Sequence, residues 1–255
     1  MAMILTPLPD IPLVQPGDDL VDLIQASLCK TDLTPQDGDI FVIAQKIVSK
    51  AENRFVNLAQ VNPSEEAVRI ANEVGKDPRF VELVLRESQS VLRTRINTLI
   101  VVHKLGFVCA NAGIDHSNVQ GRGGNPEDWV LLLPENPDAS AEAIRKGLER
   151  LYRARLAVMI IDSHGRAWRL GVVGTTIGIS GAPALVDMRG KPDMFGYQLR
   201  ITQIAAADEL AAGASLVMGQ ANEKSPVVHV RGFPYPLRES GLNELLRPED
   251  QDLFR

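Results

Sequence analysis

The chain has 255 residues, 45% of them hydrophobic, and carries a formal net charge of -5 at pH 7. It is long enough to bury one large core or two small ones, as a globular protein does. Its acidic and basic residues are interspersed, so we do not expect nucleic acid or an anionic membrane as a partner. With two cysteines, no signal-peptide pattern and no apolar run near the roughly 20 residues of a membrane span, we expect a cytoplasmic protein.

Prolines keep the opening segment Leu8–Leu13 extended, and a helix is predicted to begin at Gly17–Asp18. The apolar residues of this helix recur with helical spacing: Leu20, Leu23, Ile24 and Leu28. The next apolar run, Ile40–Ala44, is short and continuous, which predicts a buried strand.

Two lysines, Lys46 and Lys50, follow the end of this predicted strand. Surface lysines usually stay solvated, but a position just past a strand end also suits the binding of phosphate oxygens. Both interpretations remain open at this point.

Two helices are predicted next. The segment Asn62–Glu65 has the form of an N-cap, a first-turn proline and a returning glutamate, and Gly75 ends the helix. A shorter helix begins at Asp77–Pro78. Neither carries an obvious chemical signal, so both are interpreted as scaffold.

Asp115 and Asn118 follow the predicted strand Thr98–His103 and a run of small residues. A carboxylate and an amide three residues apart can face one site if the chain turns here. The alternative is a loop whose Asx side chains form only local hydrogen bonds.

The run Val158–Ile161 predicts a strand covered on both faces, and it ends in Asp162 and Ser163. Residues at the carboxyl end of such a strand line the binding crevice of many α/β proteins. Asp162 could instead cap a turn through Ser163–Gly165.

Strands and helices surround this stretch. Trp129–Pro134 is predicted to return to a sheet, and Pro137–Asp138 to open a helix with Ile144, Leu148 and Leu151 on one face. Glycines and β-branched residues in Trp168–Gly181 indicate a strand lying against a ligand or another backbone. A long alanine-rich helix over Gln198–Leu216 and a strand over Val227–Val230 complete the chain.

The chain has no glycine-rich phosphate loop of the usual spacing, no dinucleotide fingerprint and no zinc-type cluster of cysteine and histidine. What remains is rich in oxygen ligands, and two cations flank them: Asp115, Asn118, Asp162, Ser163 and Gln220, with Lys50 and Arg166. Hard ligands beside cations suit magnesium or manganese holding a polyphosphate.

Six phrases, in this order, resemble the coenzyme F-420-0:L-glutamate ligases: Ala44–Glu52, Asn111–Asn118, Ile161–Arg166, Gly171–Gly174, Met218–Gln220 and Val230–Gly232. The resemblance implies a GTP-dependent ligase that adds L-glutamate to the precursor of the deazaflavin coenzyme F-420, first by an amide and then by γ-linkage, through an acyl phosphate. It also implies a divalent metal, magnesium or manganese, together with potassium. The implied fold is mixed α/β (α+β), in two domains, with an intertwined homodimer.

The resemblance assigns site residues by matching phrases. Asp115 and Asp162 bind one metal, while Ser163 and Gln220 bind a second. Lys50 and Arg166 are the candidate catalytic cations that steady departing charge. The residues implied to hold GTP are Ile11, Pro12, Leu13, Gln45, Lys46, Lys50, Asn118, Met218, Gly219, Gln220, Ala221, Asn222, Glu223, Lys224 and Ser225.

These assigned contacts come from both ends of the chain and from its middle. We therefore expect residues 1–90 and 201–255 to form a nucleotide-binding domain and residues 91–200 an inserted metal- and substrate-binding domain. A ligase for a different carboxylate would keep every phrase, and a non-catalytic nucleotide-binding module would need none of the acids, so both remain alternatives.

Overall fold

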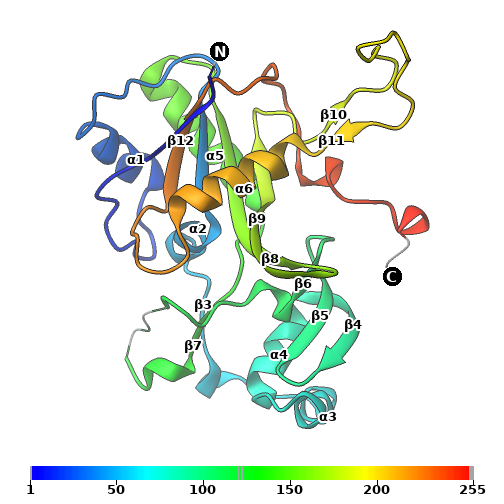
Figure 1. Ribbon diagram of the computed structural model, residues 1–255. Helices are drawn as coiled ribbons and strands as arrows, with labels where there is room; N and C mark the ends of the chain where they lie inside the picture. The colour runs from blue at the N-terminus through cyan, green and yellow to red at the C-terminus, as the bar shows by residue number, and fades with distance from the viewer. Residues whose placement is uncertain (1, 120, 122, 253–255) are drawn as a thin grey trace.

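The computed structural model describes residues 2–119, 121 and 123–252 and has two lobes (Figure 1). The large lobe, residues 2–52 and 135–252, is built on a five-stranded sheet. The small lobe, residues 53–134, contains two smaller sheets and two helices. Several sheets with helices on them confirm the expected mixed α/β class.

The sheet of the large lobe has the strand order β1-β12-β2-β8-β9. Only β2 and β8 run parallel, and every other neighbouring pair is antiparallel. The strands are β1 (Ile4–Pro7), β2 (Ile40–Ala44), β8 (Ala157–Arg166), β9 (Arg169–Ser180) and β12 (Val227–Arg231).

Helices cover both faces of this sheet. One face packs on α1 (Leu20–Leu28) and α5 (Pro137–Tyr152), and the other packs on α6 (Ala206–Met218). Because side chains alternate along a strand, Phe41 and Ile43 enter the first core while their neighbours Ile40 and Val42 enter the second. Each fully buried side chain of this size stabilises the fold by roughly 1.5–3 kcal/mol.

The glycines of β9 allow close packing, as the sequence predicted. A Cβ atom at Gly174 would lie 2.6 Å from the Ala211 carbonyl oxygen of α6. One at Gly178 would lie 2.5 Å from the backbone of Pro137, at the start of α5. Backbone, and not a ligand, therefore occupies the space beside these glycines.

The small lobe packs α3 (Glu65–Val74) and α4 (Pro78–Arg86) against an antiparallel sheet of order β4-β5-β6. Its strands are β4 (Ser88–Arg95), β5 (Thr98–His103) and β6 (Val108–Ala110), and the pair β3 (Phe55–Asn57) and β7 (Trp129–Leu131) lies beside them. The helix α2 (Gln45–Ala51) leads from β2 towards this lobe (Figure 1). Short 3-10 turns cover Leu58–Gln60, Asn111–Gly113, Pro126–Asp128, Leu242–Glu244 and Glu249–Gln251.

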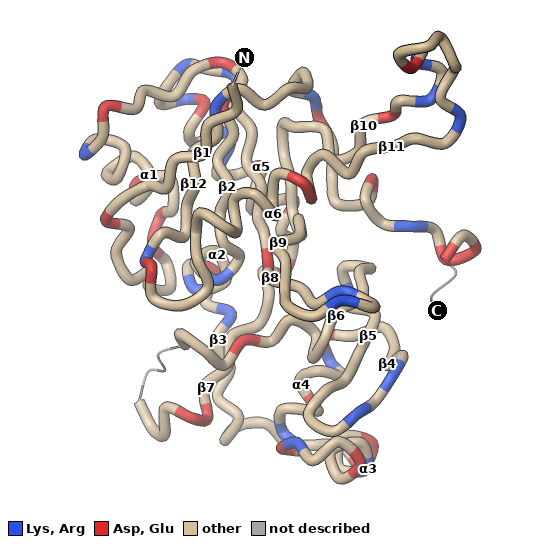
Figure 2. Tube along the Cα trace, viewed as in Figure 1, with Lys and Arg blue, Asp and Glu red and all other residues tan. Residues whose placement is uncertain are grey.

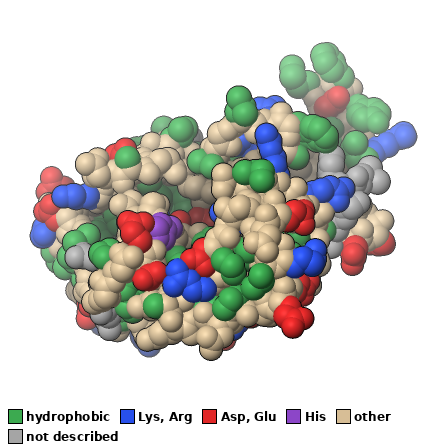
Figure 3. All heavy atoms as spheres, turned by 90° about the horizontal axis from the view of Figure 1, so that it is seen from below, with side chains coloured by type: hydrophobic (Ala, Val, Ile, Leu, Met, Phe, Trp, Pro, Cys, Tyr) green, Lys and Arg blue, Asp and Glu red, His purple; other side chains and the backbone are tan. Residues whose placement is uncertain are grey.

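A two-stranded arm of β10 (Val186–Asp187) and β11 (Gln203–Ile204) projects from the large lobe (Figure 1). Hydrophobic side chains gather on the arm in the view of Figure 3. Met194 is 93% exposed and Phe195 91% exposed. These residues have no core of their own to enter.

Three local predictions were wrong. The last helix begins at Ala206 and not at Gln198, because Gln203 and Ile204 pair with β10. The cap of α3 is Ser64, whose hydroxyl accepts from the Ala67 N–H, instead of Asn62. Leu151 is 45% exposed and lies off the buried face of α5.

The predicted domain bounds stay a prediction. Strands β8 and β9, from the segment predicted to be inserted, belong to the large sheet, where β8 pairs with β2 and β9 pairs with β8. In the described part of the chain, no helix is both long and apolar enough to cross a membrane.

Candidate functional site

The parallel pair β2 and β8 brings two site segments to one edge of the sheet. Ala44 at the end of β2 lies opposite Ile161 of β8, so Gln45 and Asp162 follow at the same edge. In α/β proteins this carboxyl edge is where ligands bind. The segment around Asp115 approaches it from the small lobe, where Asp115 and Leu131 exchange backbone hydrogen bonds of 2.9 and 2.8 Å.

Asp115 is held by two groups of α2. Its Oδ2 accepts a 2.6 Å hydrogen bond from Gln45 Nε2, and its Oδ1 lies 3.3 Å from Lys46 Nζ. Burial raises the pKa of Asp115 above its ordinary value, and the charge of Asp162 adds to the rise while Lys46 opposes it. The two carboxylates therefore share one electrostatic environment.

Asp162 lies inside β8 and does not cap a turn, because the strand continues to Arg166. The Nε2 atom of His164, two residues on and hence on the same strand face, is 3.0 Å from Asp162 Oδ2. Burial alone would raise the pKa of Asp162, but the His164 ring and the Lys46 charge outweigh it and hold the pKa below its ordinary value. Asp162 is thus the more readily ionised of the two acids.

Ser163 and Gln220 are in contact although they lie 57 residues apart in the sequence. The Ser163 hydroxyl donates a 2.9 Å hydrogen bond to Gln220 Oε1, and Gln220 Nε2 donates one of 2.9 Å to Ser215 Oγ. Gly219, with φ at 74°, ends α6 and turns the chain so that Gln220 reaches β8. This pair places a hydroxyl and an amide oxygen next to the strand that carries Asp162.

Lys46 and Lys50 lie one turn apart on α2, so their side chains share a helix face. Lys46 Nζ donates a 3.1 Å hydrogen bond to the Ser117 carbonyl oxygen. Burial lowers the pKa of Lys50, Lys46 lowers it further, and Asp115 partly offsets both. Two neighbouring ammonium groups beside two acids form a site of mixed charge that suits a metal-bound polyphosphate.

The loop after α6 contacts the small lobe. Asn118 Nδ2 donates a 3.3 Å hydrogen bond to the Ala221 carbonyl oxygen, which joins Met218–Ser225 to the segment of Asp115. Within the loop, Glu223 Oε2 accepts a 2.8 Å bond from the Ala221 N–H. Most residues predicted to hold GTP therefore line one region.

Two groups of predicted site residues lie away from the centre of this region. The segment with Ile11, Pro12 and Leu13 shares a hydrophobic core with Ile47 and Val48 of α2, and a 2.8 Å bond runs from the Gly17 N–H to the Ala51 carbonyl oxygen. Ile11 is buried and Leu13 is exposed. Arg166 lies at the exposed end of the β8–β9 hairpin, where its guanidinium approaches the Leu170 carbonyl oxygen at 3.5 Å.

Two residues were not singled out from the sequence. His164 was treated only as part of a turn, and continuing the two-residue strand alternation past Asp162 would have found it. Ser215, which supports Gln220, lies in a helix that the sequence identified without indicating which residues faced β8.

The donor set fits a hard cation. Among the described residues, no group of three or more His, Cys, Asp or Glu side chains forms a metal site. Two partly buried carboxylates, one of which raises the pKa of the other, with hydroxyl and amide oxygens nearby, are nevertheless the donors that magnesium and manganese take together with water.

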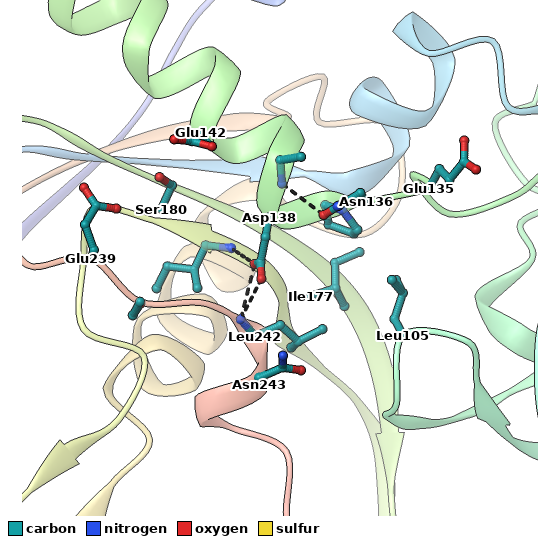
Figure 4. Close-up of a pocket in the computed structure, with 14 residues that line it drawn as sticks. Leu105, Glu135, Asn136, Asp138, Glu142, Ile177, Ser180, Glu239, Leu242 and Asn243 are labelled. Atoms are coloured by element: carbon teal, nitrogen blue, oxygen red, sulfur yellow. Dashed lines mark hydrogen bonds between the residues drawn. The ribbon is translucent and has the colours of Figure 1, made fainter.

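A cavity of about 560 Å³ lies elsewhere, between the start of α5, β9 and the C-terminal segment. Figure 4 shows that Asp138 there points at backbone groups: it accepts from the N–H of Ile179 at 2.8 Å and of Leu242 at 3.0 Å. None of the predicted site residues lines this cavity. Its central acid has a structural role.

Residues 10–232 match the family model described as F420-0:Gamma-glutamyl ligase. The chain is 45% identical over 247 residues to the coenzyme F420:L-glutamate ligase of Methanothermobacter thermautotrophicus, covering 96% of each chain. It is 44% identical over 220 residues to that of Methanocaldococcus jannaschii, covering 86% of each. The enzyme of Methanopyrus kandleri is 43% identical over 246 residues, covering 95% of this chain and 93% of the relative.

Proposed function

The chain belongs to the F420-0:gamma-glutamyl ligase family, and from this we propose that it is a GTP-dependent coenzyme F420:L-glutamate ligase. The observation that carries the proposal is the meeting of Asp115, Asp162 and the α2 lysines at the carboxyl edge of β2 and β8. A carboxylate acceptor needs such a site, because it must be activated before an amine can attack it.

We propose that Asp115 and Asp162 hold one divalent cation and that Ser163 and Gln220 hold a second. Bound there, magnesium or manganese would neutralise the triphosphate and polarise the γ-phosphoryl group. Gln45 holds Asp115 in place through the 2.6 Å hydrogen bond, and Ser49 in turn donates to Gln45 Oε1 at 2.9 Å. His164 and the charge of Lys46 hold the pKa of Asp162 below its ordinary value in spite of burial, which keeps this acid ionised for the cation.

In the proposed reaction, a carboxylate oxygen of the acceptor attacks the γ-phosphorus of GTP, GDP leaves, and an acyl phosphate forms. The α-amino group of L-glutamate then attacks the acyl carbon, phosphate leaves, and an amide is made. Lys50 lies beside the acids with a lowered pKa and is the cation that we assign to the departing charge.

GTP is assigned to the region that joins α2, Asn118 and the loop after α6. This assignment is supported by the hydrogen bond from Asn118 to Ala221 and by the paired lysines on α2. Potassium, which the family resemblance also implies, is proposed as the monovalent cation, and we propose a cytoplasmic location.

We further propose that the enzyme is an intertwined homodimer. The projecting arm supports this proposal, because Met194 and Phe195 are more than 90% exposed and have no partner core within the chain. Twofold dimers are also the most common oligomers. The domain division at residues 90 and 200 remains part of the same proposal.

The test is incubation with GTP, L-glutamate and the glutamate-free coenzyme precursor, followed by mass spectrometry. We expect a product heavier by one glutamate residue, or by more if elongation continues, and GDP in equal amount. GTP hydrolysis that depends on a different carboxylate would point to the alternative ligase. Nucleotide binding without any product would point to a non-catalytic module.

A further inference from the structure

The end of the β8–β9 hairpin carries a group of exposed residues, of which only Arg166 was assigned a role from the sequence. We define this group, the hairpin tip, as Arg166, Trp168, Arg169 and Leu170. Trp168 is 91% exposed and Leu170 is 98% exposed. The tip lies at the end of the strand that bears Asp162 and Ser163, and Figure 2 shows its basic residues beside β6.

The two arginines of the tip face each other. Arg166 and Arg169 are directly paired across the hairpin, so their side chains leave the same face of the ribbon a few ångströms apart. Like charges in directly opposite positions destabilise a hairpin. Among the residues that the structure describes, neither guanidinium forms an ion pair with a carboxylate. An anion placed between them would remove this repulsion.

The aromatic ring of the tip is also uncovered. Trp168 adopts φ of 63° in the turn, a conformation unusual for a large side chain, and its ring contacts no other described ring or cation. On the projecting arm the situation differs, because Arg200 already lies over the Tyr197 ring at 5.7 Å. The tip therefore has an open aromatic face beside two unpaired positive charges.

Position along the strand connects the tip with the reaction. At about 3.3 Å per residue, Trp168 lies on the order of 15 Å along the ribbon from Ser163. A ligand whose reacting carboxylate lies beside the acids could therefore reach the tip with its other end. Asp162, His164 and Arg166 alternate on one face of β8. The side chains of Asp162 and His164 are only 15% and 11% exposed, so a ligand that joins the tip to the acids would pass the exposed Arg166.

We propose that the hairpin tip binds the far end of the acceptor, with Trp168 stacked on its planar ring and the two arginines on its anionic chain. The inference rests on the function proposed above, in which the acceptor is a deazaflavin, a planar ring system, joined to a chain that ends in the reacting carboxylate. In this arrangement the acceptor binds at the hairpin tip. GTP binds on the other side of Asp162, at α2 and the loop after α6.

The test compares steady-state constants for the three substrates in Trp168→Ala and Arg169→Gln. We expect the KM for the acceptor to rise about tenfold with Trp168→Ala and severalfold with Arg169→Gln, which corresponds to the loss of one stacking or charged contact. The KM values for GTP and L-glutamate should stay within about twofold of wild type, as should kcat at saturating acceptor.

Matched controls come from the β4–β5 hairpin. Ile96→Ala removes an apolar residue that is 65% exposed in that turn, and Arg93→Gln removes an exposed arginine from β4. Both should leave all three KM values unchanged. A second readout is tryptophan fluorescence: the acceptor alone, without GTP, should quench the emission of wild type more than that of Trp168→Phe.

An unchanged acceptor KM in Trp168→Ala, in a wild-type enzyme that makes product, would overturn this inference and leave the proposed function intact. Dissociation of Trp168→Ala into monomers in sedimentation would show that a second copy of the chain covers the tip, and this would also overturn it. A wild-type protein that makes no product would instead remove the proposed function and, with it, the inference.

Discussion

The acids at the two ends of strand β2 differ in how many hydrogen-bond donors surround them. At its start, the Asp39 side chain is 2% exposed and is surrounded by donors: His229 Nε2 at 2.8 Å, Arg231 Nη2 at 2.6 Å and the Gln36 N–H at 2.9 Å. Past its end, Asp115 has one amide donor and a lysine at 3.3 Å, and Asp162 has a histidine.

This difference appears in the ionisation of the acids. Burial opposes ionisation of Asp39, but Arg231, His229 and Gln36 lower its pKa to about 2. Burial and the neighbouring Asp162 raise the pKa of Asp115 instead. Removing the charge of a fully paired buried acid destabilises the fold, because its partners lose their counter-charge. An acid with few donors around it can still bind a cation. The predictions below test this contrast.

The largest expected effect is on stability at the start of β2. Asp39→Asn removes the buried charge that Arg231 and His229 surround, and leaves the partly exposed Arg231 without its charged partner. We expect a loss of about 3–5 kcal/mol in the free energy of unfolding, measured by urea denaturation. Asp115→Asn is the matched control at the other end and should cost far less. Equal losses of unfolding free energy in the two variants would contradict the proposed difference between the two ends of β2.

The next effect is on catalysis. Asp162→Asn preserves size and removes the charge assigned to the cation, so kcat/KM should fall about 100-fold or more. Its melting temperature should stay near that of wild type. Isothermal titration with magnesium should show weaker binding in the same variant. Full activity at ordinary metal concentration would exclude Asp162 as a metal ligand.

A third effect concerns pH. The pKa of Asp39 falls from 3.8 to about 2 on folding, so its contribution is present in full above pH 3.8 and is lost as the pH drops towards 2. Folding stability should therefore fall by about 2 kcal/mol more over this window in wild type than in Asp39→Asn. The comparison needs denaturation curves at several pH values. Parallel curves for the two proteins would contradict the assignment.

The smallest effect is on nucleotide affinity. Lys50→Ala removes an ammonium group that the structure keeps half-buried beside Lys46 and Asp115. The Kd for GTP should rise about tenfold, or roughly 1.4 kcal/mol, with little change in melting temperature. An unchanged Kd for GTP together with a higher KM for the acceptor would assign Lys50 to the acceptor.

Much of the fold could be predicted from local patterns. Apolar runs identified β2, β5 and β12, and Asp77 caps α4 as its position before Pro78 indicated. His103 and His229 lie within apolar runs, a pattern that favours a structural role, and both are buried. Asp208 lies in the predicted alanine-rich helix, and its Oδ1 accepts the Thr176 N–H at 2.9 Å.

Other features depend on contacts distant in sequence. Nothing near Asp39 in the sequence indicates its role, because its partners His229 and Arg231 are about 190 residues away. The extension of β8 past Asp162 was missed, since polar residues and a glycine weaken the apolar signal of a strand that pairs with β9. The proposed metal and nucleotide residues remain predictions from the family resemblance, although the structure brings Asp115, Gln45 and Lys46 into contact.

The place of β12 in the sheet affects how the chain can be made. It pairs with β1 on one side and β2 on the other, yet it is the last of the five strands to leave the ribosome. Until residue 231 emerges, β1 and β2 have no strand between them. The small lobe, which is formed from residues 53–134, can fold during synthesis, whereas the large lobe must wait for an interior strand of its sheet. The sheet that carries Asp162 and Ser163 is therefore completed only after residue 231 has been made.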